Sequence, residues 1–119
     1  MSNNSSLILI PKALNYISYC YIFLNKLPRV EKFNIGNEFK NIMYDMLNNI
    51  VYLNKISYNR IMYLNKIDSD ILIQRLYLRI MFKNRYIDSK KFDYSILLLD
   101  ELGRLVGGYI RSLYNEKKR

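Results

Sequence analysis

The sequence predicts an all-α protein that folds as an antiparallel, up-down-up-down bundle of four helices. Apolar residues recur at intervals of three and four along most of the 119 residues, which is the spacing of one helix face. No stretch shows the apolar–polar alternation between turn residues that marks a strand. Short connections make consecutive helices antiparallel neighbours. We expect a flexible N-terminus over residues 1–9, the bundle over 10–114 and a basic tail over 115–119.

The first two helices are expected over residues 12–27 and 30–53. Pro28 separates them, because the residue before a proline is pushed out of the α region. The core-facing rows are Ile10, Leu14, Ile17, Tyr21 and Leu24 in the first helix, and Ile35, Phe39, Ile42, Met46, Asn49 and Leu53 in the second. Asn49 is polar, so it either fixes register or oligomer state or lies at an exposed position.

The third helix is expected over residues 57–83 and carries two apolar faces. One face consists of Leu64, Ile67, Ile71, Leu78 and Met81, and the other of Leu72, Leu76 and Ile80. A helix that is apolar on two sides has more apolar surface than a monomeric bundle buries. The second face therefore predicts an interface between copies of the chain, that is, a homo-oligomer.

The fourth helix is expected to begin at a cap formed by Asp88 or Ser89 and to reach residue 114. Its apolar row has heptad spacing and consists of Ile96, Leu99, Gly103, Val106, Ile110 and Leu113. Glycine costs a helix roughly 1 kcal/mol relative to alanine. The presence of Gly103, Gly107 and Gly108 therefore suggests that a neighbouring backbone or a ligand approaches here, and we place these glycines in the oligomer packing.

The composition excludes several kinds of catalytic or metal site within the chain. It has no histidine and one cysteine, so it offers no intrachain disulfide, no His/Cys metal cluster and no His-based triad. Cys20 lies in an apolar stretch and is expected to be a buried structural thiol. Asp100 and Glu101 are adjacent, so they diverge on a helix. The same holds for Asp68 and Asp70, two positions apart. We therefore expect no catalytic residues, no metal and no cofactor.

Two features predict a cytoplasmic protein with no membrane partner. The longest uncharged run near the start, residues 13–25, is too short to span a bilayer. The first residues lack the basic segment of a signal peptide.

The formal net charge of +9 favours a polyanionic partner.

Positive charge is concentrated where the third helix meets the fourth, because no acidic residue occurs between Ile71 and Ile87. The basic residues of this region are Arg75, Arg79 and Lys83, which form one stripe at four-residue spacing, followed by Arg85, Lys90 and Lys91. Such a stripe either contacts phosphates or is a solvated face. The lack of local acids favours a functional patch.

Two further arginines, Arg104 and Arg111, lie one heptad apart in the fourth helix. Arg104 has Asp100 and Glu101 within one helical turn, and a local ion pair would account for it. Arg111 has no acid at these spacings and is the freer of the two.

Two segments resemble the accessory variability determinant (Avd) proteins of diversity-generating retroelements. The stretch Leu98–Ser112, reading LLDELGRLVGGYIRS, is similar to the last helix of that family. The stretch Leu27–Asn37, reading LPRVEKFNIGN, matches a first-turn motif that the family shares with four-helix proteins encoded within ribosomal RNA intervening sequences. The resemblance covers residues 10–113. Tyr109 stands where family members often have tryptophan.

The resemblance implies a fold, an assembly and a function. Avd-like proteins are four-helix bundles that form barrel-shaped homopentamers, and their basic surface binds the retroelement reverse transcriptase and RNA. The complex copies a template-repeat RNA with adenine-directed errors, and the cDNA diversifies a target gene. The expected function is therefore that of a non-enzymatic accessory subunit of a reverse transcriptase. Its binding residues would be Arg75, Arg79, Lys83, Arg85, Lys90, Lys91, Arg104 and Arg111.

Two other functions remain open on the sequence. One is a basic helical oligomer that acts as a structural protein-interaction module for an acidic partner. The other is an RNA-binding protein of the ribosomal RNA intervening-sequence type. A neighbouring reverse transcriptase gene and an adenine-rich template repeat would favour the retroelement subunit.

Overall fold

The computed structural model describes residues 3–117 of the chain, and the side chains of residues 7–116. This part is all-helical and contains no strand. Its helices are α1 (Asn3–Leu24), the short α2 (Arg29–Phe33), α3 (Ile35–Lys55), α4 (Arg60–Lys83) and α5 (Ser89–Lys117). The all-α prediction is confirmed.

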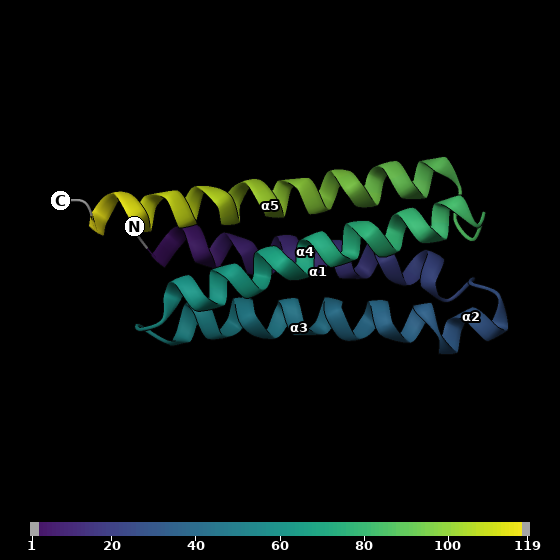
Figure 1. Cartoon of the computed structure of the whole chain (residues 1–119), viewed down its shortest axis with the longest axis horizontal. Helices are drawn as coiled ribbons and strands as arrows, with labels where there is room; N and C mark the ends of the chain where they lie inside the picture. Colours follow the sequence, from purple (N-terminus) through teal and green to yellow (C-terminus); the bar gives the residue numbers. More distant parts are fainter. Residues whose placement is uncertain (1–2, 118–119) are drawn as a thin grey trace.

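The four long helices lie lengthwise against one another in a body of 52 × 22 × 20 Å (Figure 1). α3 packs against α1 and α4, and α5 packs against α1 and α4. The order around the bundle is therefore α1, α3, α4, α5, with α1 diagonally opposite α4. Figure 1 also shows α2 and the α4–α5 turn at the same end of the bundle, away from both termini.

The N-terminal helix begins at Asn3 and not at residue 12 as expected. The segment predicted to be flexible is thus helical from Asn3 onward, and Leu9 within it is fully buried. Pro11 lies inside the helix on its exposed side, where the carbonyl that loses its partner can bond to water. At the other end α5 continues to Lys117, so the predicted tail is helical as far as that residue; Lys118 and Arg119 lie outside the described residues.

The helix expected over residues 30–53 is two helices that meet at Asn34, whose φ of −101° and ψ of −96° interrupt the helical backbone. The absence of a side chain at Gly36 allows α2 to pack closely against the start of α3. A Cβ on Gly36 would lie 3.1 Å from the carbonyl oxygen of Glu31 and 3.3 Å from Leu27 Cδ1. The close approach therefore favours a residue without a side chain.

The core-facing side of α1 differs from the expected row. Leu14 and Tyr21 are 49% and 37% exposed, and the buried row consists of Leu9, Ala13, Tyr16, Ile17, Cys20, Phe23 and Leu24. The prediction for Leu14 and Tyr21 was wrong because α1 is apolar around most of its circumference. Periodicity cannot decide which side of such a helix faces the core.

Among the other long helices, α4 follows its expected row and α5 follows it only in part. In α4 the first predicted face, from Leu64 to Met81, is buried throughout. In α5 the buried residues are Ser95, Leu98, Leu99, Leu102, Val106 and Tyr109, so the core side is rotated from the predicted heptad row. Gly103 and Ile110 lie at its edge.

Asn49 is buried in α3, and its side-chain amide donates to the carbonyl and to Oδ2 of Asp45, at 3.0 and 3.2 Å. The exposed alternative for Asn49 is therefore excluded.

We predict that Gly36→Ala lowers the free energy of unfolding by about 1–3 kcal/mol, because the added methyl group meets backbone at the α2–α3 corner. Gly108→Ala is the matched control, since its methyl group would lie at an ordinary 3.8 Å from Arg111 Nη2. The control should be neutral or more stable by up to about 1 kcal/mol. Urea unfolding of both variants is the measurement, and equal stability of the two would contradict a steric role for Gly36.

Candidate nucleic-acid interface

Gly103 of α5 provides room for an arginine side chain, because a Cβ on Gly103 would lie 3.0 Å from Nη2 of Arg75. A Cβ on Gly107 or Gly108 would lie at an ordinary contact distance from the Arg111 guanidinium group, 3.5 Å from Nη1 and 3.8 Å from Nη2 respectively. Within the described part of the chain, the Arg75 guanidinium group therefore occupies the space at Gly103 for which the sequence suggested a neighbouring backbone or a ligand.

These side chains line a hollow of about 420 Å³ on the α4–α5 side of the bundle. We call it the α5 groove, and its lining residues are Asp68, Arg75, Asp100, Gly103, Arg104, Gly107 and Arg111. Three guanidinium groups and two carboxylates meet there. The α5 groove is therefore lined mainly by polar groups and carries net positive charge.

Arg75 is not the unpaired cation that the sequence predicted. Its Nη2 and Nε lie 3.0 and 3.1 Å from Oδ1 of Asp100, across the α4–α5 contact. The prediction failed because the acid comes from the neighbouring helix, 25 residues away. Arg79 and Lys83, the other members of the predicted stripe, are exposed.

Arg104 does not form the local ion pair expected for it. Asp100 contacts Arg75, and Oε2 of Glu101 lies 3.4 Å from Nζ of Lys12 on α1. Among the residues that the structure describes, no carboxylate is in ion-pair contact with Arg104 or Arg111. Both side chains are exposed, so they remain available to an anion.

The α4–α5 turn carries part of the predicted patch. Asp88 caps α5 by accepting a hydrogen bond from the backbone N–H of Lys91 at 2.8 Å, and its Oδ2 lies 3.1 Å from Nζ of Lys91. These interactions with Lys91 hold the pKa of Asp88 below its usual value. Lys91 is therefore engaged with the cap, whereas Lys83, Arg85 and Lys90 are exposed.

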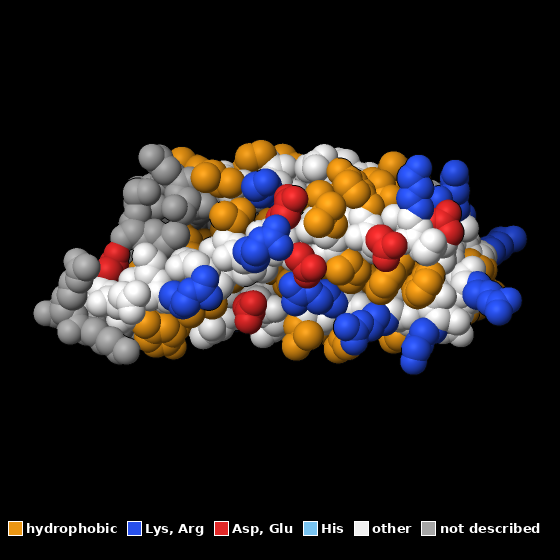
Figure 2. All heavy atoms as spheres, turned by 90° about the horizontal axis from the view of Figure 1, so that it is seen from above, with side chains coloured by type: hydrophobic (Ala, Val, Ile, Leu, Met, Phe, Trp, Pro, Cys, Tyr) orange, Lys and Arg blue, Asp and Glu red, His pale blue; other side chains and the backbone are white. Residues whose placement is uncertain are grey.

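The α1–α2 region contributes further basic residues to this end of the bundle. The exposed basic residues of both regions form what we call the end cluster: Lys26, Arg29, Lys32, Lys83, Arg85 and Lys90. Figure 2 shows Lys and Arg side chains gathered at this end, on the right of the view. The first three were not among the residues predicted from the sequence, although Arg29 and Lys32 lie in the Leu27–Asn37 motif.

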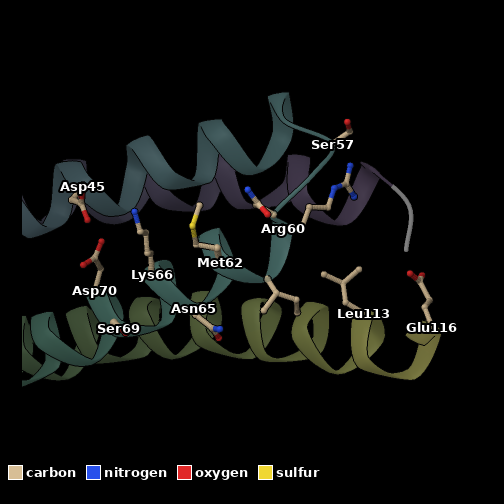
Figure 3. Close-up of a pocket in the computed structure, with 12 residues that line it drawn as sticks. Asp45, Ser57, Arg60, Met62, Asn65, Lys66, Ser69, Asp70, Leu113 and Glu116 are labelled. Atoms are coloured by element: carbon tan, nitrogen blue, oxygen red, sulfur yellow. The ribbon is translucent and has the colours of Figure 1, made fainter. Parts of the chain in front are cut away.

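A larger open hollow of about 1100 Å³ lies toward the opposite end, along α4 (Figure 3). At its inner edge Asp45 of α3 and Asp70 of α4 point toward each other. Asp70 is 6% exposed, and its Oδ2 has no hydrogen-bond partner among the described residues. Burial and the contact with Asp45 raise the pKa of Asp70 to about 7. This pair was not predicted, because Asp45 and Asp70 lie on different helices and local spacing does not relate them.

The described residues offer little else for chemistry. They include no group of three or more His, Cys, Asp or Glu that could hold a metal ion. Cys20 is buried as expected, and burial raises the pKa of its thiol to about 12. The exposed charged groups of the α5 groove and the end cluster are therefore the strongest candidate binding surfaces.

Comparison with known proteins identifies one family. A family model described as bAvd-like matches residues 7–113, which is nearly the whole chain. A comparison with curated proteins gave no match.

We predict that Asp70→Asn removes a pH dependence of stability. The folded chain keeps a proton on Asp70 up to a pKa of about 7, whereas an unfolded aspartate loses it near 3.8. The wild type should therefore lose stability as pH rises from about 4 to about 7. Above that range Asp70→Asn should be the more stable chain by at least about 1 kcal/mol, which is about 4 °C in Tm.

Melting curves from pH 4 to pH 8 test this expectation. Asp68→Asn is the control at an exposed position of the same helix, and it should keep the wild-type profile. An unchanged profile for Asp70→Asn would contradict a raised pKa of Asp70 in the folded chain.

Proposed function

The chain belongs to the bAvd-like family, and we propose that it is the non-enzymatic accessory subunit of a diversity-generating retroelement. In this role it binds the element's reverse transcriptase and its template-repeat RNA in the cytoplasm and enables mutagenic reverse transcription. The bundle is antiparallel and acts as a homo-oligomer, most simply a pentamer.

The α5 groove is the observation that carries the nucleic-acid part of this proposal. Arg104 and Arg111 are exposed on one helix and lack carboxylate partners among the described residues. A guanidinium group donates two parallel hydrogen bonds and so suits a phosphate better than a point charge does. The groove fits the sugar–phosphate backbone of RNA or of the cDNA strand, without base-specific readout.

The end cluster suits a protein partner. Val30 and Phe33 of α2 are each 68% exposed there, next to the basic residues Arg29 and Lys32. Exposed aromatic side chains and arginine, here Phe33 and Arg29, are enriched at protein–protein contacts. We therefore assign the end cluster to the reverse transcriptase and the α5 groove to RNA.

We predict that the double variant Arg104→Ala, Arg111→Ala binds single-stranded RNA at least about tenfold more weakly than the wild type, because two phosphate contacts are lost. The slope of log K against log salt should become shallower by about 1.4 for the same reason. Fluorescence anisotropy over a salt series measures both quantities.

The control removes the same charge from another helix. Lys40→Ala, Lys55→Ala changes two cations on α3, which lies diagonally opposite α5. This variant should keep most of the affinity and the slope. If the two double variants weakened binding equally, net charge alone would explain the interaction and the groove would have no special role.

We further predict that Phe33→Ser weakens capture of the reverse transcriptase encoded beside this chain, while RNA affinity stays unchanged. The exposed ring contributes little to the bundle core, so its loss should not alter folding. Co-purification and RNA anisotropy on the same variant separate the two activities. RNA binding without any capture of the polymerase would favour the intervening-sequence type of RNA-binding protein.

A further inference from the structure

The open hollow along α4 has a pair of carboxylates from different helices at its inner edge. Asp45 of α3 and Asp70 of α4 both line the hollow, and they point toward each other there (Figure 3). Asp45 is exposed to solvent, whereas Asp70 is only 6% exposed. Neither residue belongs to the α5 groove or to the end cluster, so the proposed function does not use this pair.

The pair has fewer hydrogen-bond donors around it than its oxygen atoms can accept. Asn49, one turn after Asp45 on α3, donates from Nδ2 to Oδ2 of Asp45 at 3.2 Å. The buried Oδ2 of Asp70 has no hydrogen-bond partner among the described residues. Buried polar atoms are normally satisfied in folded proteins, so this oxygen atom indicates a missing donor or cation.

A further oxygen atom without a partner lies one helical turn along α4. Gln74 is fully buried, and its Nε2 donates to the backbone carbonyl of Asp70 at 3.0 Å and to Sδ of Met46 on α3 at 3.3 Å. Its Oε1 has no hydrogen-bond partner in the described part of the chain. Residues four positions apart lie on one helix face. Asp70 and Gln74 therefore bring unpaired oxygen atoms to the side of α4 that packs against α3.

The basic residues around the hollow do not neutralise the pair. Lys66 lies one turn before Asp70, but no ion pair joins it to either carboxylate within the described residues. Arg60 lies away from the pair, and its Nη1 donates to the hydroxyl group of Tyr109 at 2.8 Å. Burial and the contact with Asp45 raise the pKa of Asp70 to about 7 despite the attraction of Lys66. The pair thus lacks a compensating positive charge.

The kind of oxygen atoms at this site favours a hard divalent cation. Carboxylate and amide oxygens suit Mg²⁺ and Mn²⁺, and Mg²⁺ is held by as few as one or two carboxylates because it keeps several of its waters. The absence of three or more His, Cys, Asp or Glu in one group among the described residues therefore does not count against it. The hollow of about 1100 Å³ has room for these waters, since each takes up about 30 Å³.

We propose that Asp45 and Asp70 bind one Mg²⁺ ion at the inner edge of this hollow, with water molecules on its open side. The amide oxygen of Gln74 is the candidate for a third protein ligand. The ion links α3 to α4 and supplies the positive charge that the two carboxylates lack. The proposal is independent of RNA binding, because it uses neither the α5 groove nor the end cluster.

Binding of Mn²⁺, which replaces Mg²⁺ as a spectroscopic probe, tests the proposal on the full chain without RNA at pH 8. Electron paramagnetic resonance measures the Mn²⁺ that stays free in solution. The wild type should bind one Mn²⁺ per chain, and added Mg²⁺ should displace it. Asp70→Asn should bind Mn²⁺ at least about tenfold more weakly, because one of two charged ligands is lost. Asp45→Asn should do the same, and its exposed position keeps the test valid if the buried change unfolds the chain.

Two control variants separate this site from general electrostatics. Asp93→Asn removes the same charge from an exposed position on α5 and should keep the wild-type affinity for Mn²⁺. Lys66→Gln should bind Mn²⁺ more tightly, because it removes a competing positive charge beside the pair. If the wild type does not bind Mn²⁺, or if Asp93→Asn weakens binding as much as Asp70→Asn, the proposal is wrong. If only Lys66→Gln binds Mn²⁺, Lys66 is the counter-ion of the pair in the wild type, and the proposal is wrong as well.

Melting curves then identify the class of cation. At about a tenfold excess over its Kd, Mg²⁺ should raise the Tm of the wild type by about 4 °C relative to sodium chloride of equal ionic strength. Asp70→Asn should show no such difference. If spermidine, and not Mg²⁺, raises the Tm through Asp70, the hollow takes an organic cation and the Mg²⁺ site is overturned.

Discussion

The ion pair between Arg75 and Asp100 determines which cations of the α5 groove are available. Arg104 lies four positions after Asp100 in the same helix, so the two could form an ion pair. The carboxylate of Asp100 instead forms its ion pair with Arg75 on α4. Glu101 is likewise turned toward Lys12 on α1. The two acids that precede Arg104 therefore contribute to contacts between helices. Such partly exposed pairs stabilise a fold by about 1 kcal/mol or less. Their larger effect is to leave Arg104 without a carboxylate partner among the described residues.

Exposed apolar side chains occur on all four long helices, for example Leu14 on α1, Tyr52 on α3, Leu72 on α4 and Leu97 on α5. In the homo-oligomer that we propose, every copy carries the same arginines on α5. A strand of RNA could then contact several copies in succession. This repetition would turn a modest affinity per groove into tight binding through effective concentration.

The sequence predicted those features that depend on local patterns. The inner face of α4 has regular spacing between Leu64 and Met81, and Asp88 stands directly before α5, so both were found. The inner face of α1 was not, because Leu14 and Tyr21 are as apolar as the residues that face the core. The Arg75–Asp100 and Asp45–Asp70 contacts were missed because each joins residues on different helices. The identity of the partners in such contacts depends on how the helices are rotated against each other, and local spacing does not contain that information.

The central claim is that RNA phosphates bind the α5 groove. A cryo-electron-microscopy structure of the full chain with its neighbouring reverse transcriptase and a template RNA tests it most directly. We expect phosphate oxygens within hydrogen-bond distance of the Arg104 and Arg111 guanidinium groups. RNA on the outer face of α3, with both arginines facing solvent, would contradict the account.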